Sequence, residues 1–318
     1  MHNDKCREFI RANSPGFSLA NEFRMKVLIL GARGRLAAGL AGVWSARHET
    51  VCLSRQELDV ADIPGIGRLL ASRTFDVLVN GTGMTNVDEC ETRREEARAV
   101  NAFAPTAMAA AARACGARFI HFSTDYVMDG RKTTPYSEED EAHPLGWYGR
   151  TKLEGERAVL ADSSSHLVVR VSWVFGPDKP SFMDMIIGRA RTSPQVEAVS
   201  DKYSSPTYAC DAAGWLEPFF APSLPGGLYH ACNSGSCSWQ EYGAHALQCA
   251  VEAGLPLATT TLEPLLLKDM KAFKAPRPAH TILSTEKISR VTGITPRPWR
   301  DAVREYIRKK YAPLPPAR

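Results

Sequence analysis

The feature that most constrains this chain is a regular alternation of short apolar runs with longer helical patterns between residues 26 and 171. Such an alternation is typical of βα units, in which parallel strands form one sheet and helices cover both of its faces. We expect helices at 34–46, 63–72, 93–115 and 148–160, and strands at 27–30, 50–53, 76–80, 118–123 and 167–171. The predicted fold class is therefore α/β, with a Rossmann-type, doubly wound parallel sheet.

The second half of the chain is less regular. From about residue 175 onward, loops rich in proline and glycine, such as 219–227, separate shorter helical segments. We predict a cofactor-binding Rossmann domain at 25–174 and a smaller, irregular C-terminal substrate lobe at 175–318, from which a segment near Val196 returns to the sheet. Residues 1–24 carry charges where a signal peptide would need an apolar run. We predict a disordered leader there, because the pattern of a folded chain begins only at Lys26.

The composition argues against several classes of function. The net charge of +4, from 39 basic and 35 acidic side chains, is too small for a nucleic-acid-binding surface. No apolar stretch is long enough to cross a membrane. The eight cysteines are scattered without a C-x-x-C pair, which favours reduced thiols in a cytoplasmic protein. The eight histidines, including His121, His230 and His245, have no metal-ligand spacing with the cysteines, so we expect no metal site.

A glycine-rich turn follows the first predicted strand. Residues 31–37 read GARGRLA, and Gly31 and Gly34 leave room for a ligand to approach the backbone where a helix begins. Backbone N–H groups at a helix N-terminus bind phosphate groups. The turn predicts a dinucleotide-binding site, although small residues alone would also fit an ordinary strand-to-helix turn.

The end of the second predicted strand indicates which dinucleotide is bound. An acidic residue there would bind the ribose 2′-hydroxyl of NAD, but this chain has Ser54 followed by Arg55. Arg33 and Arg35 of the glycine turn would help Arg55 to hold a 2′-phosphate. We therefore expect NADPH as the cofactor, with NADH as the alternative. Asp59 comes too late for the ribose role, and we expect it to contact adenine or to supply a negative charge at a helix N-terminus.

Polar side chains follow the third and fourth predicted strands, at the sheet edge where such folds bind ligands. Thr82 and Gly83 follow the third strand, and Thr124 follows the fourth. Tyr148 and Lys152 come later, at a spacing that places both side chains on one face of a helix. A Y-x-x-x-K spacing alone also fits a surface pair. After a dinucleotide turn and a strand-end threonine, we interpret it as a catalytic pair.

Thr124, Tyr148 and Lys152 together predict the reduction of a carbonyl group. The pKa of a tyrosine is about 10, and a nearby ammonium group such as that of Lys152 would lower it by favouring the phenolate. We expect Tyr148 to protonate the carbonyl oxygen and Thr124 to orient that oxygen by a hydrogen bond. The nicotinamide cofactor supplies the hydride.

Over residues 25 to 310 the chain resembles the extended short-chain dehydrogenase/reductase superfamily and, more narrowly, the dTDP-4-dehydrorhamnose reductase family. The resemblance extends beyond the glycine turn and the Y-x-x-x-K pair, and the order and spacing of the motifs fit throughout. The further segments that carry it are VNGTGMTNVD at 79–88, VNA at 100–102, STDYVMDG at 123–130, PY at 135–136, SWVFG at 172–176, SPTY at 205–208, PRP at 276–278 and PWR at 298–300.

This resemblance implies a substrate and a set of site residues. The implied substrate is a nucleoside-diphosphate 4-keto-6-deoxyhexose, with dTDP-4-dehydrorhamnose reduced to dTDP-rhamnose for cell-surface polysaccharide. The oligomeric state stays open, with a homodimer as one alternative. The implied cofactor-binding residues are Gly31, Arg33, Gly34, Arg35, Leu36, Asp59, Thr82, Gly83, Asn101, Tyr148 and Lys152, the catalytic residues are Thr124, Tyr148 and Lys152, and the residues lining the sugar-nucleotide pocket are Thr85, Val87, Asp125, Tyr126 and Trp173.

The chain departs from the family pattern near the cofactor and the substrate. GTGM at 81–84 stands where the family usually has alanines and an aromatic residue, and Arg35 and Ala37 stand where a glutamine and a third glycine are usual. The change at Met84 concerns the substrate side, so it leaves the identity of the sugar open. Arg35 adds a positive charge beside the pyrophosphate, which would tighten NADPH binding.

Two other functions fit the same fold. A non-catalytic, NADP-binding regulatory subunit is expected to lose the Tyr/Lys pair, which this chain keeps. A nucleotide-sugar epimerase or dehydratase would use the same tyrosine but retain a tightly bound NAD, whereas Arg55 and the R-P element at 277–278 favour a reductase that exchanges NADPH. The acid-rich segment at 88–96 is expected only to complement a helix dipole, without a partner.

Overall fold

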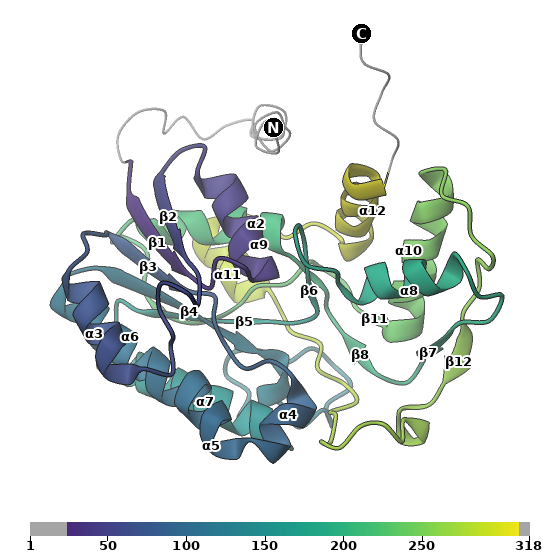
Figure 1. Ribbon diagram of the computed structural model, residues 1–318, viewed down its shortest axis with the longest axis horizontal. Coiled ribbons are helices and arrows are strands. Elements are labelled where there is room, and N and C mark those ends of the chain that lie inside the picture. Colours follow the sequence, from purple (N-terminus) through teal and green to yellow (C-terminus); the bar gives the residue numbers. More distant parts are fainter. Residues whose placement is uncertain (1–23, 312–318) are drawn as a thin grey trace, which may run out of the picture.

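The computed structural model describes residues 24–311, and a six-stranded sheet forms its centre (Figure 1). Its strands are β1 Lys26–Leu30, β2 Glu49–Leu53, β3 Val77–Asn80, β4 Arg118–Thr124, β5 Leu167–Val171 and β10 Gly227–His230. They lie in the order β10-β5-β4-β3-β1-β2, and every neighbouring pair is parallel. Because β1 pairs with β2 on one side and with β3 on the other, the strand order reverses at β1. The predicted Rossmann-type, doubly wound sheet is thus confirmed.

Helices cover both faces of this sheet, and the alternation of side chains along each strand supplies both cores. Val27 and Ile29 of β1 belong to one apolar cluster, and Leu28 and Leu30 belong to another. All residues of β3 and β5 are buried, as expected for parallel strands between two helical layers. Figure 1 shows the two layers, which are α2 Arg35–Trp44, α9 Ala209–Leu216 and α11 Glu286–Thr292 on one face, and α3 Ile63–Ala71, α6 Ala104–Ala114 and α7 Trp147–Asp162 on the other.

The helix predicted at 93–115 is interrupted. It consists of α5 Arg94–Arg98, the π-helical turn η1 Ala99–Phe103 and α6. Pro105 has no N–H group, so the carbonyl of Asn101 cannot receive the usual helical hydrogen bond, and the N–H of Ala104 bonds to the carbonyl of Ala99. The open side of this turn allows α7 to pack closely, since a Cβ at Gly155 would lie only 2.3 Å from the carbonyl oxygen of Asn101.

A second lobe packs beside the sheet and has its own core, which includes Phe175, Tyr242 and Trp299 (Figure 1). Short strands pair within and beside it, with β12 on β7, β11 on β8 and β9 on β6. The elements concerned are β6 Val174–Phe175, α8 Phe182–Ala190, β7 Glu197–Val199, β8 Tyr203–Ser204, β9 Thr207–Tyr208, β11 Cys237–Ser238, α10 Trp239–Glu252, β12 Glu263–Leu265 and α12 Trp299–Tyr311. Short helical segments η3 Glu217–Phe220 and η4 Leu267–Asp269 connect elements of this half of the chain.

The segment that returns to the sheet is β10, and the prediction that a segment near Val196 returns is wrong. The strand beside Val196 is β7, which pairs with β12 in the second lobe. The return is made after the proline- and glycine-rich loop at 219–227, where Gly227 has a φ of +120° and a Cβ at Gly226 would lie 2.3 Å from the carbonyl oxygen of Ser164. Only glycines permit this close approach beside the start of β5. Segments on both sides of residue 175 therefore build the sheet.

Some predictions concern side chains or segments away from this framework. The predicted leader lies outside the described residues apart from Arg24, and Cys6 lies outside them as well. Within residues 24–311 the cysteines form no disulfide with one another. Between residues 24 and 311, no helix is both long and apolar enough to cross a membrane, and no three His, Cys, Asp or Glu side chains are grouped as metal ligands.

Candidate active site

The glycine turn lies at the carboxyl end of β1, where the strand order reverses. Gly31 has a φ of +90°, and a Cβ on it would lie 3.0 Å from the backbone carbon and oxygen of Gly81. A Cβ on Gly34 would lie 3.0 Å from the carbonyl oxygen of Gly31. Helix α2 begins directly after Gly34, without a capping side chain and without an acidic residue in its first turn. Its first N–H groups can therefore bind an anion, and the turn fits the pyrophosphate of a dinucleotide.

Two of the predicted arginines lie together after β2. Arg33 donates a hydrogen bond to Gln56 at 3.1 Å. Arg55 pairs with Asp59 at 3.1 Å, and 80% of the Arg55 side chain is exposed. An exposed ion pair contributes little, so Arg55 can exchange Asp59 for a 2′-phosphate, which accepts stronger hydrogen bonds. Asp59 also accepts a hydrogen bond from the N–H of Ala61, which gives it a local role in the turn rather than a demonstrated contact with adenine.

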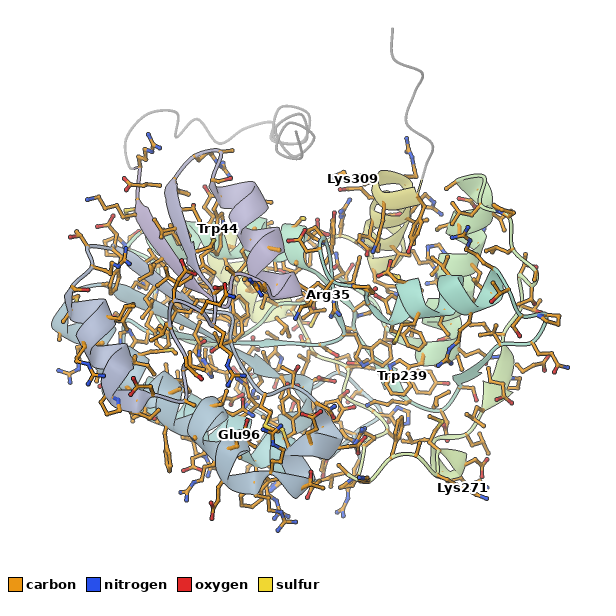
Figure 2. All side chains as sticks on the ribbon, in the orientation of Figure 1. Arg35, Trp44, Glu96, Trp239, Lys271 and Lys309 are labelled. Carbon is orange, nitrogen blue, oxygen red and sulfur yellow. The ribbon has the colours of Figure 1, made fainter. Side chains whose placement is uncertain are left out.

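Arg35 does not join these two arginines. Its guanidinium donates to the carbonyl oxygens of Val174 at 2.8 Å, Pro180 at 2.6 Å and Lys179 at 3.2 Å. Figure 2 shows Arg35 between the sheet and the second lobe. The expectation that its side chain adds to the phosphate site is therefore wrong. The guanidinium already donates its hydrogen bonds to carbonyl oxygens of β6 and of the loop that follows it. The backbone of Arg35 still lies in the first turn of α2.

Asn101 holds the loop after β3. Its Oδ1 accepts from the N–H of Met84 at 2.9 Å, and its Nδ2 donates to the carbonyl of Met84 at 3.0 Å and to Thr151 Oγ1 at 3.2 Å. A Cβ on Gly83 would lie 3.3 Å from Asn101 Oδ1. The protein thus engages both polar atoms of Asn101, which positions the loop of Thr82 and Gly83, and Asn101 stays a predicted cofactor-binding residue.

Thr124 and Tyr148 meet where β4 ends and α7 begins, and their hydroxyl groups share a hydrogen bond. Thr124 Oγ1 also donates to Asp125 Oδ1 at 3.1 Å and accepts from the N–H of Tyr126 at 3.2 Å. Burial raises the pKa of Tyr148, and the hydrogen bond with Thr124 only partly opposes this shift. The phenol therefore keeps its proton at neutral pH. A protonated phenol beside a fixed hydroxyl is suited to protonate a carbonyl oxygen.

Lys152 has surroundings that differ from the prediction. It is buried, and its Nζ donates to the carbonyl of Phe122 at 2.6 Å and lies 3.3 Å from His121 Nε2. Burial lowers the pKa of Lys152 to about 8. The prediction that Lys152 lowers the pKa of Tyr148 is wrong in this structure, because burial raises the pKa of the phenol and Lys152 Nζ is directed to a main-chain carbonyl.

Asp125 and Tyr126 connect this pair of hydroxyl groups to more distant parts of the chain. Asp125 is buried, and its Oδ2 accepts from Ser204 at 3.1 Å and from Thr281 at 2.5 Å. Its two oxygens are thus both used inside the protein, and it fixes Thr124 rather than lining an open pocket. The ring of Tyr126 lies edge-on to that of Tyr148, with the centroids 5.7 Å apart.

Trp173 offers a donor to a ligand. Its ring lies 5.8 Å from the rings of both Tyr242 and Trp239, and Figure 2 places Trp239 in the second lobe. Its φ of +42° is uncommon for a large side chain. The indole Nε1 is buried and has no hydrogen-bond partner within residues 24–311. A buried donor of this kind is normally satisfied, so a ligand acceptor would complete it.

The short helix α4, Val87–Thr92, is tied to the C-terminal half of the chain. Asp88 accepts from both Arg277 nitrogens, at 3.1 and 2.8 Å, and from the N–H of Ala275 at 2.8 Å. Asp88 of the acid-rich helix entry therefore also ties α4 to Arg277, in addition to its place at a helix N-terminus. Thr85 is exposed and Val87 is half-buried beside this contact, so both stay predicted pocket residues.

Sequence reasoning missed Lys202. Its side chain is fully buried, and Nζ donates to the carbonyl of Pro278 at 2.6 Å. The same nitrogen lies 4.8 Å from the ring centre of Tyr126 and 5.9 Å from that of Trp239. Burial lowers its pKa to about 8. The only signal in the sequence is its place just before the SPTY motif, which does not reveal that a lysine there is buried.

Comparisons with known proteins show the family of this chain. The family model described as the RmlD substrate binding domain matches residues 25–312. The spore coat polysaccharide biosynthesis protein SpsK of Bacillus subtilis is 34% identical over 90% of this chain and 98% of the relative, and the dTDP-4-dehydrorhamnose reductase of Escherichia coli is 32% identical over 90% and 98%. A solved dTDP-4-dehydrorhamnose reductase from Clostridium acetobutylicum superposes with a TM-score of 0.81 at 30% identity, covering 89% of this chain and 98% of that one. With its glycine turn, its strand-end hydroxyl and its Y-x-x-x-K helix in their predicted order, the chain belongs to the RmlD substrate binding domain family.

Proposed function

We propose that this protein is an NADPH-dependent reductase of a nucleotide-linked 4-keto-6-deoxy sugar. We assign dTDP-4-dehydrorhamnose as the substrate and dTDP-rhamnose as the product, for use in cell-surface polysaccharide. Relatives named dTDP-4-dehydrorhamnose reductase span about nine-tenths of the chain, which supports this substrate. The observation that carries the proposal is the buried hydroxyl pair of Thr124 and Tyr148 at the sheet edge that also holds the glycine turn.

Different residues around the glycine turn bind different parts of the cofactor. The start of α2 binds the pyrophosphate, close to Gly31 and Gly34, which leave the necessary space. Arg33 of the glycine turn and Arg55 after β2 hold the 2′-phosphate, because each guanidinium has only an exposed partner, Gln56 for Arg33 and Asp59 for Arg55. NADPH supplies the hydride when it is bound.

The protein contributes the proton and the orientation of the carbonyl. Tyr148 holds its proton on the phenol oxygen, since burial raises its pKa, and donates that proton to the carbonyl oxygen of the sugar. When the sugar binds, Thr124 turns its single hydroxyl proton from Asp125 Oδ1 to this carbonyl oxygen and keeps the oxygen in place. The indole N–H of Trp173 is left for an acceptor on the nucleotide sugar.

Two alternatives are less well supported. A non-catalytic, NADP-binding subunit would not need a hydroxyl pair at the sheet edge, and Thr124 and Tyr148 form one. An epimerase or dehydratase that retains NAD would not need the exposed arginines Arg33 and Arg55. A homodimer and a cytoplasmic location stay predictions from the sequence.

The test is the oxidation of NADPH, followed by its absorbance, in the presence of enzymatically prepared dTDP-4-keto-6-deoxyhexose. The Tyr148→Phe variant removes the acid but keeps the ring, so we expect turnover to fall by about 10²-fold or more, while the Kd for NADPH stays within about twofold. Tyr229→Phe is the matched control, because the Tyr229 hydroxyl donates to the carbonyl of Pro225, away from the site. Oxidation that persists in Tyr148→Phe would remove Tyr148 as the acid. Tight NADPH binding without oxidation in the natural protein would favour the regulatory alternative.

A further inference from the structure

His121 has no part in the mechanism above, although it lies against a catalytic residue. It is in the middle of β4 and completely buried. Its Nδ1 lies 3.1 Å from Asn80 Nδ2, and its Nε2 lies 3.3 Å from Lys152 Nζ. Both ring nitrogens of His121 thus contact polar groups, and the other hydrogen bonds of those groups show whether each donates to His121 or accepts from it.

The contacts of Asn80 determine which nitrogen of His121 carries the proton. Asn80 Oδ1 accepts from the backbone N–H of Thr82 at 3.0 Å and from its hydroxyl at 2.6 Å. A backbone N–H can only donate, so the oxygen of Asn80 must face Thr82 and its NH₂ group must face His121. The NH₂ group can only donate as well. His121 Nδ1 is therefore the acceptor, and the neutral ring carries its proton on Nε2. Burial holds the pKa of His121 well below its usual value, so the ring stays neutral.

This tautomer has a consequence for Lys152. The Nε2–H of His121 points at Nζ, and an ammonium group there would place two donors against each other. A neutral amine has a lone pair that can accept from Nε2–H, and it can still donate one of its own hydrogens to the carbonyl of Phe122 at 2.6 Å. Every polar contact of the two residues is satisfied only in this state.

The other groups that face Lys152 do not demand a positive charge. Glu156, on the same helix, raises the pKa of Lys152, but both of its oxygens accept from Arg170, at 2.9 and 2.7 Å. Cys90 of α4 has a pKa raised to about 11 by burial and is a neutral thiol. Tyr148 is a neutral phenol, since burial raises its pKa. Within the described part of the chain, no uncompensated anion lies against the amine.

We propose that His121 is a positioning residue which donates its Nε2 proton to Lys152 and favours the neutral amine form of that side chain until a dinucleotide binds. The negative charge of a dinucleotide bound at the same sheet edge favours the ammonium form. Binding therefore takes up a proton from solvent at Nζ in the fraction of molecules whose amine is neutral, a fraction that grows as the pH rises through the Lys152 pKa of about 8. The His121 hydrogen bond to Lys152 is lost in exchange. This consequence for cofactor binding rests on the proposed function, whereas the tautomer of His121 does not.

The first measurement is the nitrogen-15 NMR spectrum of the histidine-labelled full chain, with the His121 signals assigned by their loss in His121→Phe. We expect an unprotonated Nδ1 and a protonated Nε2 between pH 6 and 9. A protonated Nδ1 would overturn the inference. Asn80→Asp supplies an acceptor in place of the NH₂ group, so it is expected to switch the proton to Nδ1.

The second measurement is the proton uptake on NADPH binding, by calorimetry in buffers of different ionisation enthalpy, together with the pH dependence of the Kd. Loss of the Nε2 donor in His121→Phe should move the midpoint of this pH dependence up by about one unit, since one hydrogen bond is worth about 1 kcal/mol. Asn80→Asp should move it further, because Nε2 would then accept from the ammonium group. His245→Phe, at a buried histidine of α10, is the control and should leave the midpoint unchanged.

These outcomes separate the inference from the proposed function. An unchanged midpoint in His121→Phe, or no proton uptake by the natural protein, would contradict the inference while leaving the reductase intact. If the natural protein does not bind NADPH at all, the proposed function fails, and the tautomer of His121 still decides the inference.

Discussion

At the scale of single residues, some polar side chains of the site already have all their hydrogen-bond partners within the protein, and others can still bind a ligand. Arg35 and Arg55 illustrate the difference. Three main-chain carbonyls hold the guanidinium of Arg35, whereas Arg55 has one exposed carboxylate as its partner. Since an exposed ion pair is easily exchanged, Arg55 rather than Arg35 can bind the 2′-phosphate and so favour NADPH over NADH.

Arg55→Ala is therefore expected to weaken NADPH binding by about tenfold, the effect of one charge-assisted hydrogen bond. Binding of NADH should stay within about twofold, because NADH has no 2′-phosphate. Fluorescence titration of both cofactors measures the two effects. Arg68→Ala is the matched control, since Arg68 forms a similar exposed pair with Asp62 at 3.4 Å. Equal weakening of NADPH and NADH would show that Arg55 does not bind the 2′-phosphate.

At the scale of elements, the position of Tyr148 depends on how closely α7 packs against the end of β4. Gly149 follows Tyr148 directly, and a Cβ on it would lie 2.2 Å from the carbonyl oxygen of Tyr126 and 2.8 Å from Pro144 Cβ. The carbonyl belongs to η2, Asp125–Val127, the turn that follows Thr124. A glycine at this position thus brings the first turn of α7 onto the residues that hold Thr124.

Gly149→Ala is expected to displace this turn and separate the Tyr148 hydroxyl from Thr124. We expect kcat to fall by at least about tenfold and the free energy of unfolding to fall by about 1 to 3 kcal/mol, as for other overpacked sites. Steady-state kinetics and urea unfolding measure these effects. Gly214→Ala in α9 is the control, because no atom lies within 4 Å of its added Cβ. It should stabilise the protein by about 0.5 to 1 kcal/mol. Unaltered kcat in a folded Gly149→Ala variant would contradict this explanation.

At the scale of the whole molecule, Asp88 and Arg277 join α4 to a segment that lies far away in the sequence. The Arg277 side chain is only 8% exposed, and the two residues are 189 positions apart. Burial of Asp88 disfavours its charge, but the hydrogen bonds from Arg277 and from two backbone N–H groups outweigh it and lower the pKa of Asp88. Gly130 contributes to the same junction, since a Cβ on it would lie 2.6 Å from Pro278 Cβ.

The contribution of this ion pair is expected to depend on pH. Because the pKa of Asp88 is lower in the folded protein than the value of about 3.9 in an unfolded chain, the pair stabilises the fold above about pH 4 and loses its effect as the pH falls through the folded pKa. Asp88→Asn should cost about 1 to 3 kcal/mol at pH 7, and the difference from the natural protein should shrink below about pH 4. Urea unfolding at several pH values measures it.

Asp301→Asn is the control for this series, because Asp301 forms an exposed pair with Arg304 and its loss should have little effect. A difference between the natural protein and Asp88→Asn that stays constant from pH 7 to pH 3 would show that the charge of Asp88 does not stabilise the junction.

The local chemistry of the chain determined its framework by itself. The apolar runs predicted the first five strands of the sheet to within about two residues, because strands that lie between two helical layers are predominantly apolar. The glycine turn, Thr124 and Tyr148 could be identified because each combines a residue type with a place at a strand end or helix start. The interruption at Asn101 also had a local cause, Pro105, which the helical pattern concealed.

Only the tertiary structure decided which partners the polar groups have. The carbonyls that hold Arg35 are 139 to 145 positions away, the partner of Lys202 is 76 positions away, and Asn80 and Lys152 reach His121 from positions 41 and 31 residues distant. The return of β10 to the sheet depends likewise on a distant strand, β5. The periodicity of a sequence indicates which face of an element is buried. A hydrogen bond between distant segments depends instead on where the folded chain places its donor and its acceptor. For this reason the sequence identified the reacting groups, and the fold determined their protonation.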